Sequence, residues 1–78
     1  MSHTIALRTT EFTKLARLAG FRSDYALAKA MGLDRSTVTR VREGALQPGP
    51  AFIAGCLVAL RPLEFKDLFE IVDRPGKK

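Results

Sequence analysis

The sequence predicts a mainly α-helical fold, a compact five-helix bundle that contains a helix-turn-helix. Residues 24–43, DYALAKAMGLDRSTVTRVRE, form two short amphipathic runs joined at Gly32, and apolar residues elsewhere recur at helical intervals of three and four. Of the 78 residues, 46% are hydrophobic, a fraction too high for a disordered chain. We therefore expect residues 1–78 to form one small domain.

The two ends of the chain contain β-favouring residues. Residues 4–7 (TIAL) and 69–72 (FEIV) alternate in part between apolar and polar side chains. Two outcomes are open: the segments pair as a short two-stranded β ribbon, with residues 1–7 supplying one terminal strand, or they remain frayed ends. Residues 74–78 have the composition of a flexible tail.

A first helix is expected from about Thr10 to Ala19, and Gly20 ends it. Its inward stripe would consist of Phe12, Leu15, Ala16 and Ala19. Ser23 is expected to cap a second helix over residues 24–31, because a serine oxygen can accept a hydrogen bond from the first-turn amides.

The turn after this helix has the residues that a close helix crossing requires. Gly32 can adopt positive φ without a Cβ clash, and Ala28 is small enough for the next helix to approach. The third helix should run from Arg35 to Glu43, with the Asp34 carboxylate as its N-cap. The seam between the two helices would consist of Leu27, Met31, Leu33, Val38 and Val41.

A fourth helix should begin at Pro50, which suits a first helical turn, and Arg61-Pro62 should interrupt it. A short fifth helix is expected from about Glu64 to Phe69. The inward side chains of these two helices would be Phe52, Ile53, Cys56, Leu57, Leu60, Phe65, Leu68 and Phe69. Cys56 is the only cysteine, so no internal disulfide can form, and its apolar neighbours predict a buried side chain without a redox role.

The exposed side of the third helix is predicted to be polar and largely cationic. At about 100° per residue, the arc opposite the two valines contains Arg35, Ser36, Thr39, Arg40 and Glu43. An arginine can bond both major-groove acceptors of guanine, while serine and threonine can donate, accept or touch a thymine methyl. The simpler alternative is an ordinary solvated helix face.

The segment SDYALAKAMGLDRSTVTRVREG resembles the helix-turn-helix of the lambda-repressor, Cro and XRE family of bacterial and phage regulators, and the likeness extends from about residue 12 to residue 69. It implies a lambda-repressor-like bundle. The chain departs from the family at Asp24, where a glutamine usually bonds the DNA backbone. A carboxylate there would repel phosphate unless Arg22 shields it. Arg42-Glu43 also replaces the common Glu-Asn.

The resemblance implies a sequence-specific transcriptional regulator, a repressor or Cro-like protein, whose partner is a double-stranded DNA operator. The third helix would read base edges in the major groove through Arg35, Ser36, Thr39 and Arg40. Backbone phosphates would be bound by Arg22, Tyr25, Arg42 and Gln47. One module of this size recognises few base pairs, so a homodimer on an inverted repeat is expected, with half-sites about 34 Å apart.

The charge distribution favours a polyanionic partner. The net charge is +5 and the pI about 10.0. Residues 1–43 contain eight basic and four acidic side chains, whereas residues 44–73 contain two basic and four acidic ones. The positive field therefore belongs to the half that contains the helix-turn-helix.

Other functional classes have less support. The chain has one histidine, one cysteine, no phosphate-binding loop and no metal-ligand spacing, so we expect no enzyme activity, cofactor, metal or small-molecule ligand. It has no apolar run of about 20 residues and no leader-like start, which favours a cytoplasmic protein without membrane contact. The main alternative is a protein-interaction module on the same bundle, such as an antitoxin or an anti-repressor.

Overall fold

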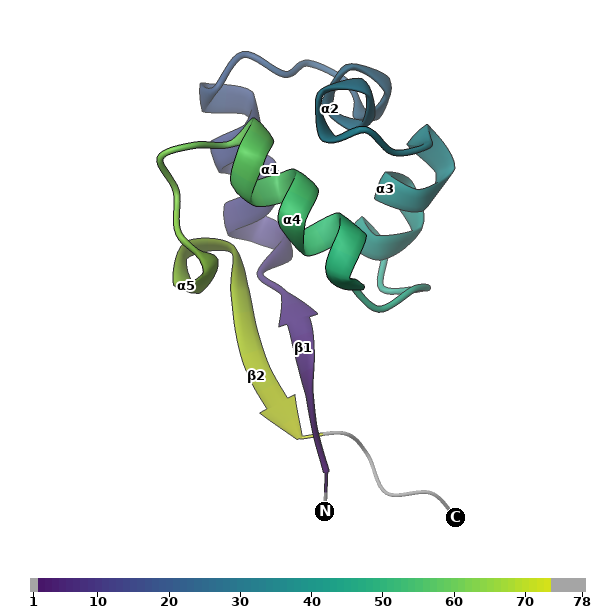
Figure 1. Ribbon diagram of the computed structural model, residues 1–78, viewed down its shortest axis with the longest axis vertical. Coiled ribbons are helices and arrows are strands. Elements are labelled where there is room, and N and C mark those ends of the chain that lie inside the picture. Colours follow the sequence, from purple (N-terminus) through teal and green to yellow (C-terminus); the bar gives the residue numbers. More distant parts are fainter. Residues whose placement is uncertain (1, 74–78) are drawn as a thin grey trace.

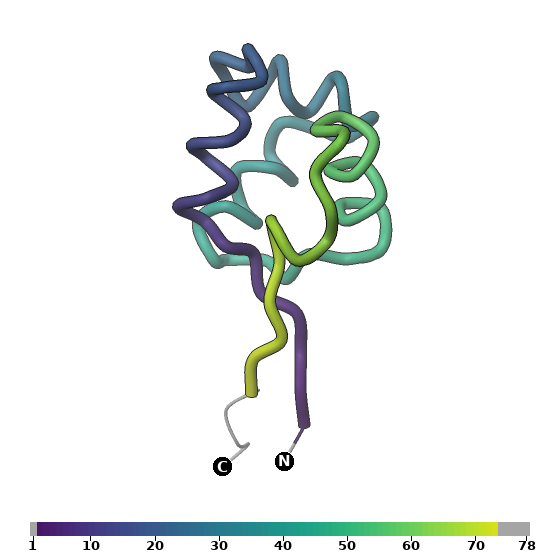
Figure 2. Tube along the Cα trace, turned by 90° about the vertical axis from the view of Figure 1, so that its left-hand side faces the viewer, coloured from purple at the N-terminus to yellow at the C-terminus, as the bar shows by residue number. Residues whose placement is uncertain are grey.

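The computed structural model describes residues 2–73 and contains a mostly helical bundle with a small antiparallel sheet. In chain order the elements are β1 (His3–Leu7), α1 (Thr9–Leu18), α2 (Asp24–Met31), α3 (Arg35–Arg42), α4 (Pro50–Ala59), α5 (Phe65–Leu68) and β2 (Phe69–Asp73). The helices gather at one end, and the two strands project together from the other (Figures 1 and 2). The predicted mainly α-helical class is confirmed. None of the helices within residues 2–73 has the length and apolar character needed to cross a bilayer.

The terminal segments pair as a β ribbon, so the alternative of frayed ends is wrong for residues 3–7 and 69–73. Ile5 lies opposite Ile71, and Leu7 lies opposite Phe69. The Arg8 amide extends the pairing by donating to the Leu68 carbonyl at 2.7 Å. Because each strand adjoins a helix of the bundle, the ribbon fixes the start of α1 beside the end of α5.

Helix α1 begins at Thr9 and ends at Leu18, one residue earlier at each end than predicted. Phe12 and Ala16 are buried as expected, but Ala19 is exposed and the prediction for it is wrong. The reason is that Ala19 already follows the last helical residue, where the chain turns toward Gly20, with φ of +98°.

The core lies between α1, α2, α3 and α4 and continues to the base of the ribbon. Its buried hydrophobic side chains are Phe12, Ala16, Leu27, Ala28, Met31, Val38, Val41, Phe52, Cys56, Leu60, Leu68 and Phe69. Gly55 lets α4 approach α2 closely, because a Cβ added at Gly55 would lie 2.9 Å from both Cβ and the carbonyl oxygen of Met31. This contact, which the sequence analysis did not foresee, holds α2 against the core.

The second half of the chain follows the predicted order. Helix α4 starts at Pro50 and ends at Ala59, just before the predicted interruption at Arg61-Pro62. Cys56 is fully buried, which confirms its expected place in the core, and burial raises the pKa of its thiol to about 12. The single turn α5 begins after Glu64, which forms reciprocal capping hydrogen bonds with Asp67.

Candidate nucleic-acid interface

Hydrogen bonds define the start of α2 and the turn that joins α2 to α3. The Ser23 hydroxyl oxygen accepts a hydrogen bond from the Ala26 amide at 3.1 Å, which confirms the predicted cap of α2. Gly32 adopts φ of +76°, and the Leu33 amide then donates to the Ala28 carbonyl at 2.9 Å. The chain therefore leaves α2 and enters α3 through a hydrogen-bonded turn.

Asp34 occupies the predicted N-cap position of α3, but its carboxylate makes no capping hydrogen bond, so that part of the prediction is wrong. The side chain is exposed to solvent, and the Asp34 carbonyl accepts from the Thr37 amide at 3.1 Å. Helix α3 ends at Arg42, one residue before the predicted end, because Glu43 is the C-cap and Gly44 follows with φ of +83°.

Two buried valines set the rotation of α3 about its axis. Val38 and Val41 are almost completely buried in the core, as predicted. Most side chains on the opposite arc therefore face outward, whereas Thr39 is only partly exposed. Arg35, Ser36 and Arg40 are all exposed, and the first of these also contributes to the field around Asp24.

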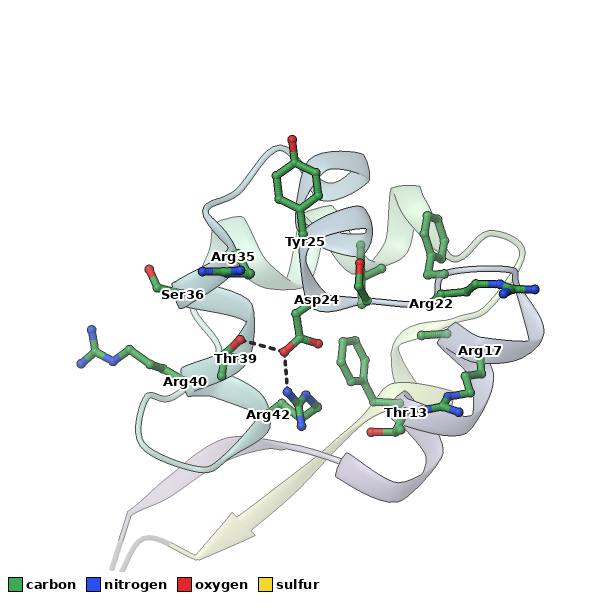
Figure 3. A pocket seen from close by; sticks show the side chains of 15 residues that line it. Thr13, Arg17, Arg22, Asp24, Tyr25, Arg35, Ser36, Thr39, Arg40 and Arg42 are labelled. Atoms are coloured by element: carbon green, nitrogen blue, oxygen red, sulfur yellow. Dashed lines mark hydrogen bonds and ion pairs between the residues drawn. The ribbon is translucent and has the colours of Figure 1, made fainter.

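An open hollow lies between α1, α2 and α3 (Figure 3). We call it the arginine hollow because five arginines are among the residues that line it or its rim. These are Arg17, Arg22, Arg35, Arg40 and Arg42. Among the side chains that line it within residues 2–73, Asp24 has the one carboxylate. The hollow and the adjoining outer face of α3 thus form one cationic surface.

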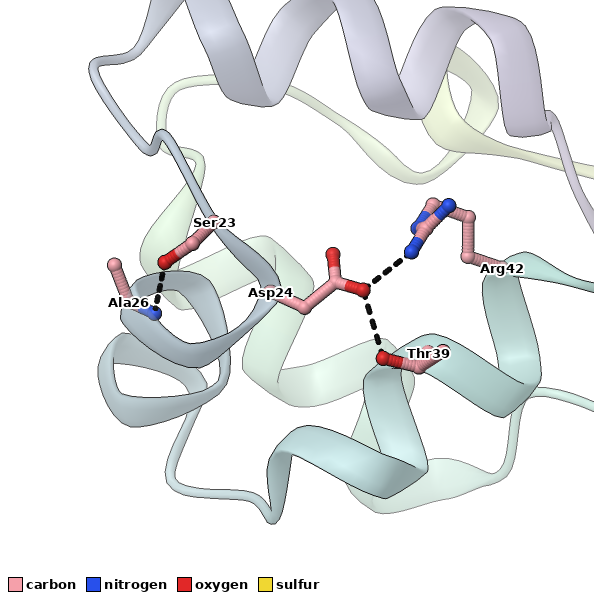
Figure 4. Close-up of polar contacts among 5 residues, drawn as sticks. All are labelled: Ser23, Asp24, Ala26, Thr39 and Arg42. Atoms are coloured by element: carbon pink, nitrogen blue, oxygen red, sulfur yellow. Dashed lines mark hydrogen bonds and ion pairs between the residues drawn. The ribbon is translucent and has the colours of Figure 1, made fainter.

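Asp24 joins α2 to α3 through its side chain (Figure 4). Its Oδ2 accepts a hydrogen bond from the Thr39 hydroxyl at 2.7 Å and a charge-assisted hydrogen bond from Nη2 of Arg42. Both members of the ion pair are partly buried, with 23% of the Asp24 side chain and 32% of the Arg42 side chain exposed. The contact therefore ties the first turn of α2 to the last turn of α3.

The ion pair also shifts the pKa of both partners. Burial by itself would raise the pKa of Asp24, but hydrogen bonds from Arg42 and Thr39 and the neighbouring positive charges together lower it. The hydrogen bond to Asp24 raises the pKa of Arg42. The condition that Arg22 shields Asp24 is not met: Arg42 is the partner of the carboxylate, and the Arg22 side chain points away from it (Figure 3).

The structure brings together most, but not all, of the predicted site residues. The residues that line the arginine hollow or its rim are Arg22, Tyr25, Arg35, Ser36, Thr39, Arg40 and Arg42. Gln47 lies on the exposed loop between α3 and α4 and does not line the hollow. Thr39 and Arg42 already bond Asp24 within the protein, which the sequence analysis did not foresee.

Two residues of α1 that the sequence analysis missed also line the arginine hollow. Thr13 and Arg17 are exposed and stand four residues apart, so they lie on the same side of the helix. Each directly follows a buried residue, Phe12 or Ala16. That position beside the inward stripe is the signal by which the sequence could have identified them.

The remaining chemistry of the described residues is limited. Between residues 2 and 73, no group of three His, Cys, Asp or Glu side chains is placed to hold a metal ion. Comparisons with protein-family models, with curated proteins and with solved structures find no match to this chain. The cationic surface is therefore the feature of the described residues that bears on function.

Proposed function

We propose that the protein is a sequence-specific double-stranded DNA-binding transcriptional regulator with a lambda-repressor-like fold, in which α3 reads the major groove. The observation that carries this proposal is the exposure of Arg35, Ser36 and Arg40 on one side of a helix whose opposite side is locked by buried valines. A helix held in this way needs no ordering of its backbone on binding, so only the side chains themselves lose conformational freedom.

The chemistry of these side chains fits base edges. Arg35 and Arg40 can each bond O6 and N7 of a guanine, and Ser36 can donate or accept. The first turn of α2 would lie across the DNA backbone, where Arg22 and Tyr25 are exposed. Arg17 of α1 adds positive charge to the same surface. Contacts to phosphate would set the docking angle, and contacts from α3 would select the sequence.

A homodimer is part of this proposal, because a single α3 reaches only a few base pairs. Two copies related by a two-fold axis would place their α3 helices in major grooves about one turn, or about 34 Å, apart. The exposed ribbon edges and the surface of α4, where Val58 is 56% exposed, are the candidate contacts. Light scattering on the protein alone and on the protein with duplex would measure the stoichiometry.

Selection of bound duplexes from a random pool tests the proposal directly. We expect enrichment of an inverted repeat whose half-sites are separated by about one helical turn. Titration of a random duplex at about 0.05 M and 0.2 M salt should also show affinity that falls steeply with salt. Absence of duplex binding at low salt would reject the proposal and favour the protein-interaction module.

A further inference from the structure

Asp24 is unusual because it places a carboxylate in the middle of a surface that otherwise attracts anions. Five arginines line the arginine hollow around it. The carboxylate is less exposed than an ordinary surface charge, with 23% of the Asp24 side chain accessible, and its Oδ2 accepts hydrogen bonds from both Thr39 and Arg42. The position of Asp24 at the first turn of α2 is also where a backbone phosphate would approach in the proposed complex.

A carboxylate and a DNA phosphate make similar demands on their partners. Both are oxyanions that accept charge-assisted hydrogen bonds from guanidinium and hydroxyl groups. The Arg42 guanidinium is anchored by Asp24, and its Nε–H is buried without a hydrogen-bond partner within residues 2–73. A phosphate could bind the Arg42 guanidinium only by displacing the Asp24 carboxylate or by lying next to it, which would place two negative charges side by side.

We propose that Asp24 is a built-in competitor for backbone phosphate, which retains Arg42 and Thr39 inside the protein and thereby weakens sequence-independent binding to DNA. This inference rests on the proposed DNA-binding function. Arg35 and Arg40 remain exposed for base edges, while one α3 cation and one hydroxyl are withheld from the backbone. Asp24 thus sets how strongly the protein binds DNA that lacks its preferred site.

The salt dependence of binding to random duplex would show directly whether Asp24 withholds Arg42 from phosphate. Each phosphate neutralised by a cation adds about 0.9 to the negative slope of log affinity against log salt concentration. Asp24→Asn would release Arg42 to contact one phosphate. The slope should therefore steepen by about 0.9, and the affinity for random duplex near 0.1 M salt should rise roughly five- to tenfold.

The test compares the wild-type chain with Asp24→Asn, Asp24→Asn/Arg42→Gln and Asp34→Asn by titrating fluorescent random duplex between about 0.05 M and 0.3 M salt. The double variant should return to the wild-type slope, because the released cation is gone. Asp34→Asn removes the same charge beside α3, but its exposed carboxylate makes no capping hydrogen bond. Its slope should change by clearly less than that of Asp24→Asn.

Several results would overturn the inference. An unchanged slope for Asp24→Asn in a wild-type chain that binds duplex would refute it and leave the DNA-binding function intact. Equal slopes for Asp24→Asn and Asp34→Asn would assign the effect to net charge alone. Absence of wild-type binding would reject both proposals. Circular dichroism checks folding of each variant, and Asp24→Ala repeats the test if Asp24→Asn does not fold.

Discussion

The two halves of the molecule differ in what their surfaces offer. The half formed by α1, α2 and α3 carries the arginine hollow and the exposed arginines of α3. Helix α4, by contrast, has no charged residue between Pro50 and Ala59, and residues 44–73 contain more acidic than basic side chains. The difference teaches that the exposed cationic groups belong to one half, whereas both halves supply side chains to the core. Substitutions of exposed arginines and substitutions of buried core residues should therefore be detected by different assays.

The largest effect is expected where α4 contributes to the core. Phe52 is buried and packs against Phe12 and Phe69, with ring centroids 5.9 Å and 6.4 Å away. Phe52→Ala should lower the free energy of unfolding by about 3–5 kcal/mol, because it leaves a cavity among aromatic rings. Urea denaturation followed by circular dichroism measures the loss.

Val58→Ala is the matched control on the same helix. Because 56% of Val58 is exposed, we expect a change within about 0.5 kcal/mol. Equal losses for the two variants would contradict the placement of Phe52 in the core. In a chain this short, the Phe52→Ala variant should keep only a small part of the wild-type free energy of unfolding, so its urea transition should begin at much lower denaturant.

Gly55→Ala would show how strongly the two halves are coupled. The new Cβ would meet Met31 at 2.9 Å, including its backbone carbonyl, so α2 and α4 must separate. We expect a loss of about 1–3 kcal/mol in the free energy of unfolding, typical of overpacking. Gly55 is buried and does not line the arginine hollow. In DNA titrations we therefore expect a smaller fraction of folded, binding-competent protein and an unchanged affinity of that fraction.

A gain in stability from Gly55→Ala would contradict the close helix contact. Ala51→Gly on the same helix serves as a control for helix propensity, since Ala51 is exposed. That exchange should cost less, about 0.5–1 kcal/mol, because it adds only the intrinsic cost of glycine in a helix.

Arg40→Ala should separate binding from stability in the opposite half. The Arg40 side chain is exposed, so the free energy of unfolding should change by no more than about 0.5 kcal/mol. Binding to the selected duplex should weaken by about 1–3 kcal/mol, and the preference for that sequence over random duplex should fall. Fluorescence anisotropy on both duplexes measures the two effects.

Arg61→Ala, which removes an exposed arginine just after α4, is the control for net charge. We expect it to weaken both duplexes slightly and to the same extent. An equal loss on selected and random duplex from Arg40→Ala would remove Arg40 from the base-reading set.

Much of the fold was predictable because local signals determine it. Ser23 and Gly32 mark the ends of α2 by their hydrogen-bonding and backbone properties, and Val38 and Val41 show the buried side of α3 through their spacing. The ribbon was only one of two open outcomes. Pairing between the two terminal strands depends on how the five helices between them pack.

The candidate site was less predictable for the same reason. The exposed positions of Arg35 and Arg40 follow from helical periodicity. The partner of Asp24 does not follow from periodicity, because Arg42 lies 18 residues away on a different helix. Only the crossing of α2 and α3 brings the two side chains together. Arg17 was missed because the position of α1 relative to α3 is likewise a property of the tertiary structure.

The smallest expected effect concerns the pH dependence of stability in the binding half. The folded state lowers the pKa of Asp24 below its unfolded value, against the opposing effect of burial. The ionised carboxylate therefore stabilises the fold above the unfolded pKa, and this contribution is lost as the pH falls through the folded pKa. Asp24→Asn should destabilise the protein most near pH 6, and the difference from wild type should shrink toward pH 2.

Urea denaturation at several pH values would follow that difference, with Asp67→Asn as a comparison because Asp67 caps α5 outside the binding half. Arg42→Gln should also diminish the stabilisation by Asp24, since burial of the carboxylate would then be less fully compensated. A constant difference between wild type and Asp24→Asn from pH 6 to pH 2 would mean that the ion pair adds nothing to stability. Any effect of Asp24 on stability would then be independent of its charge.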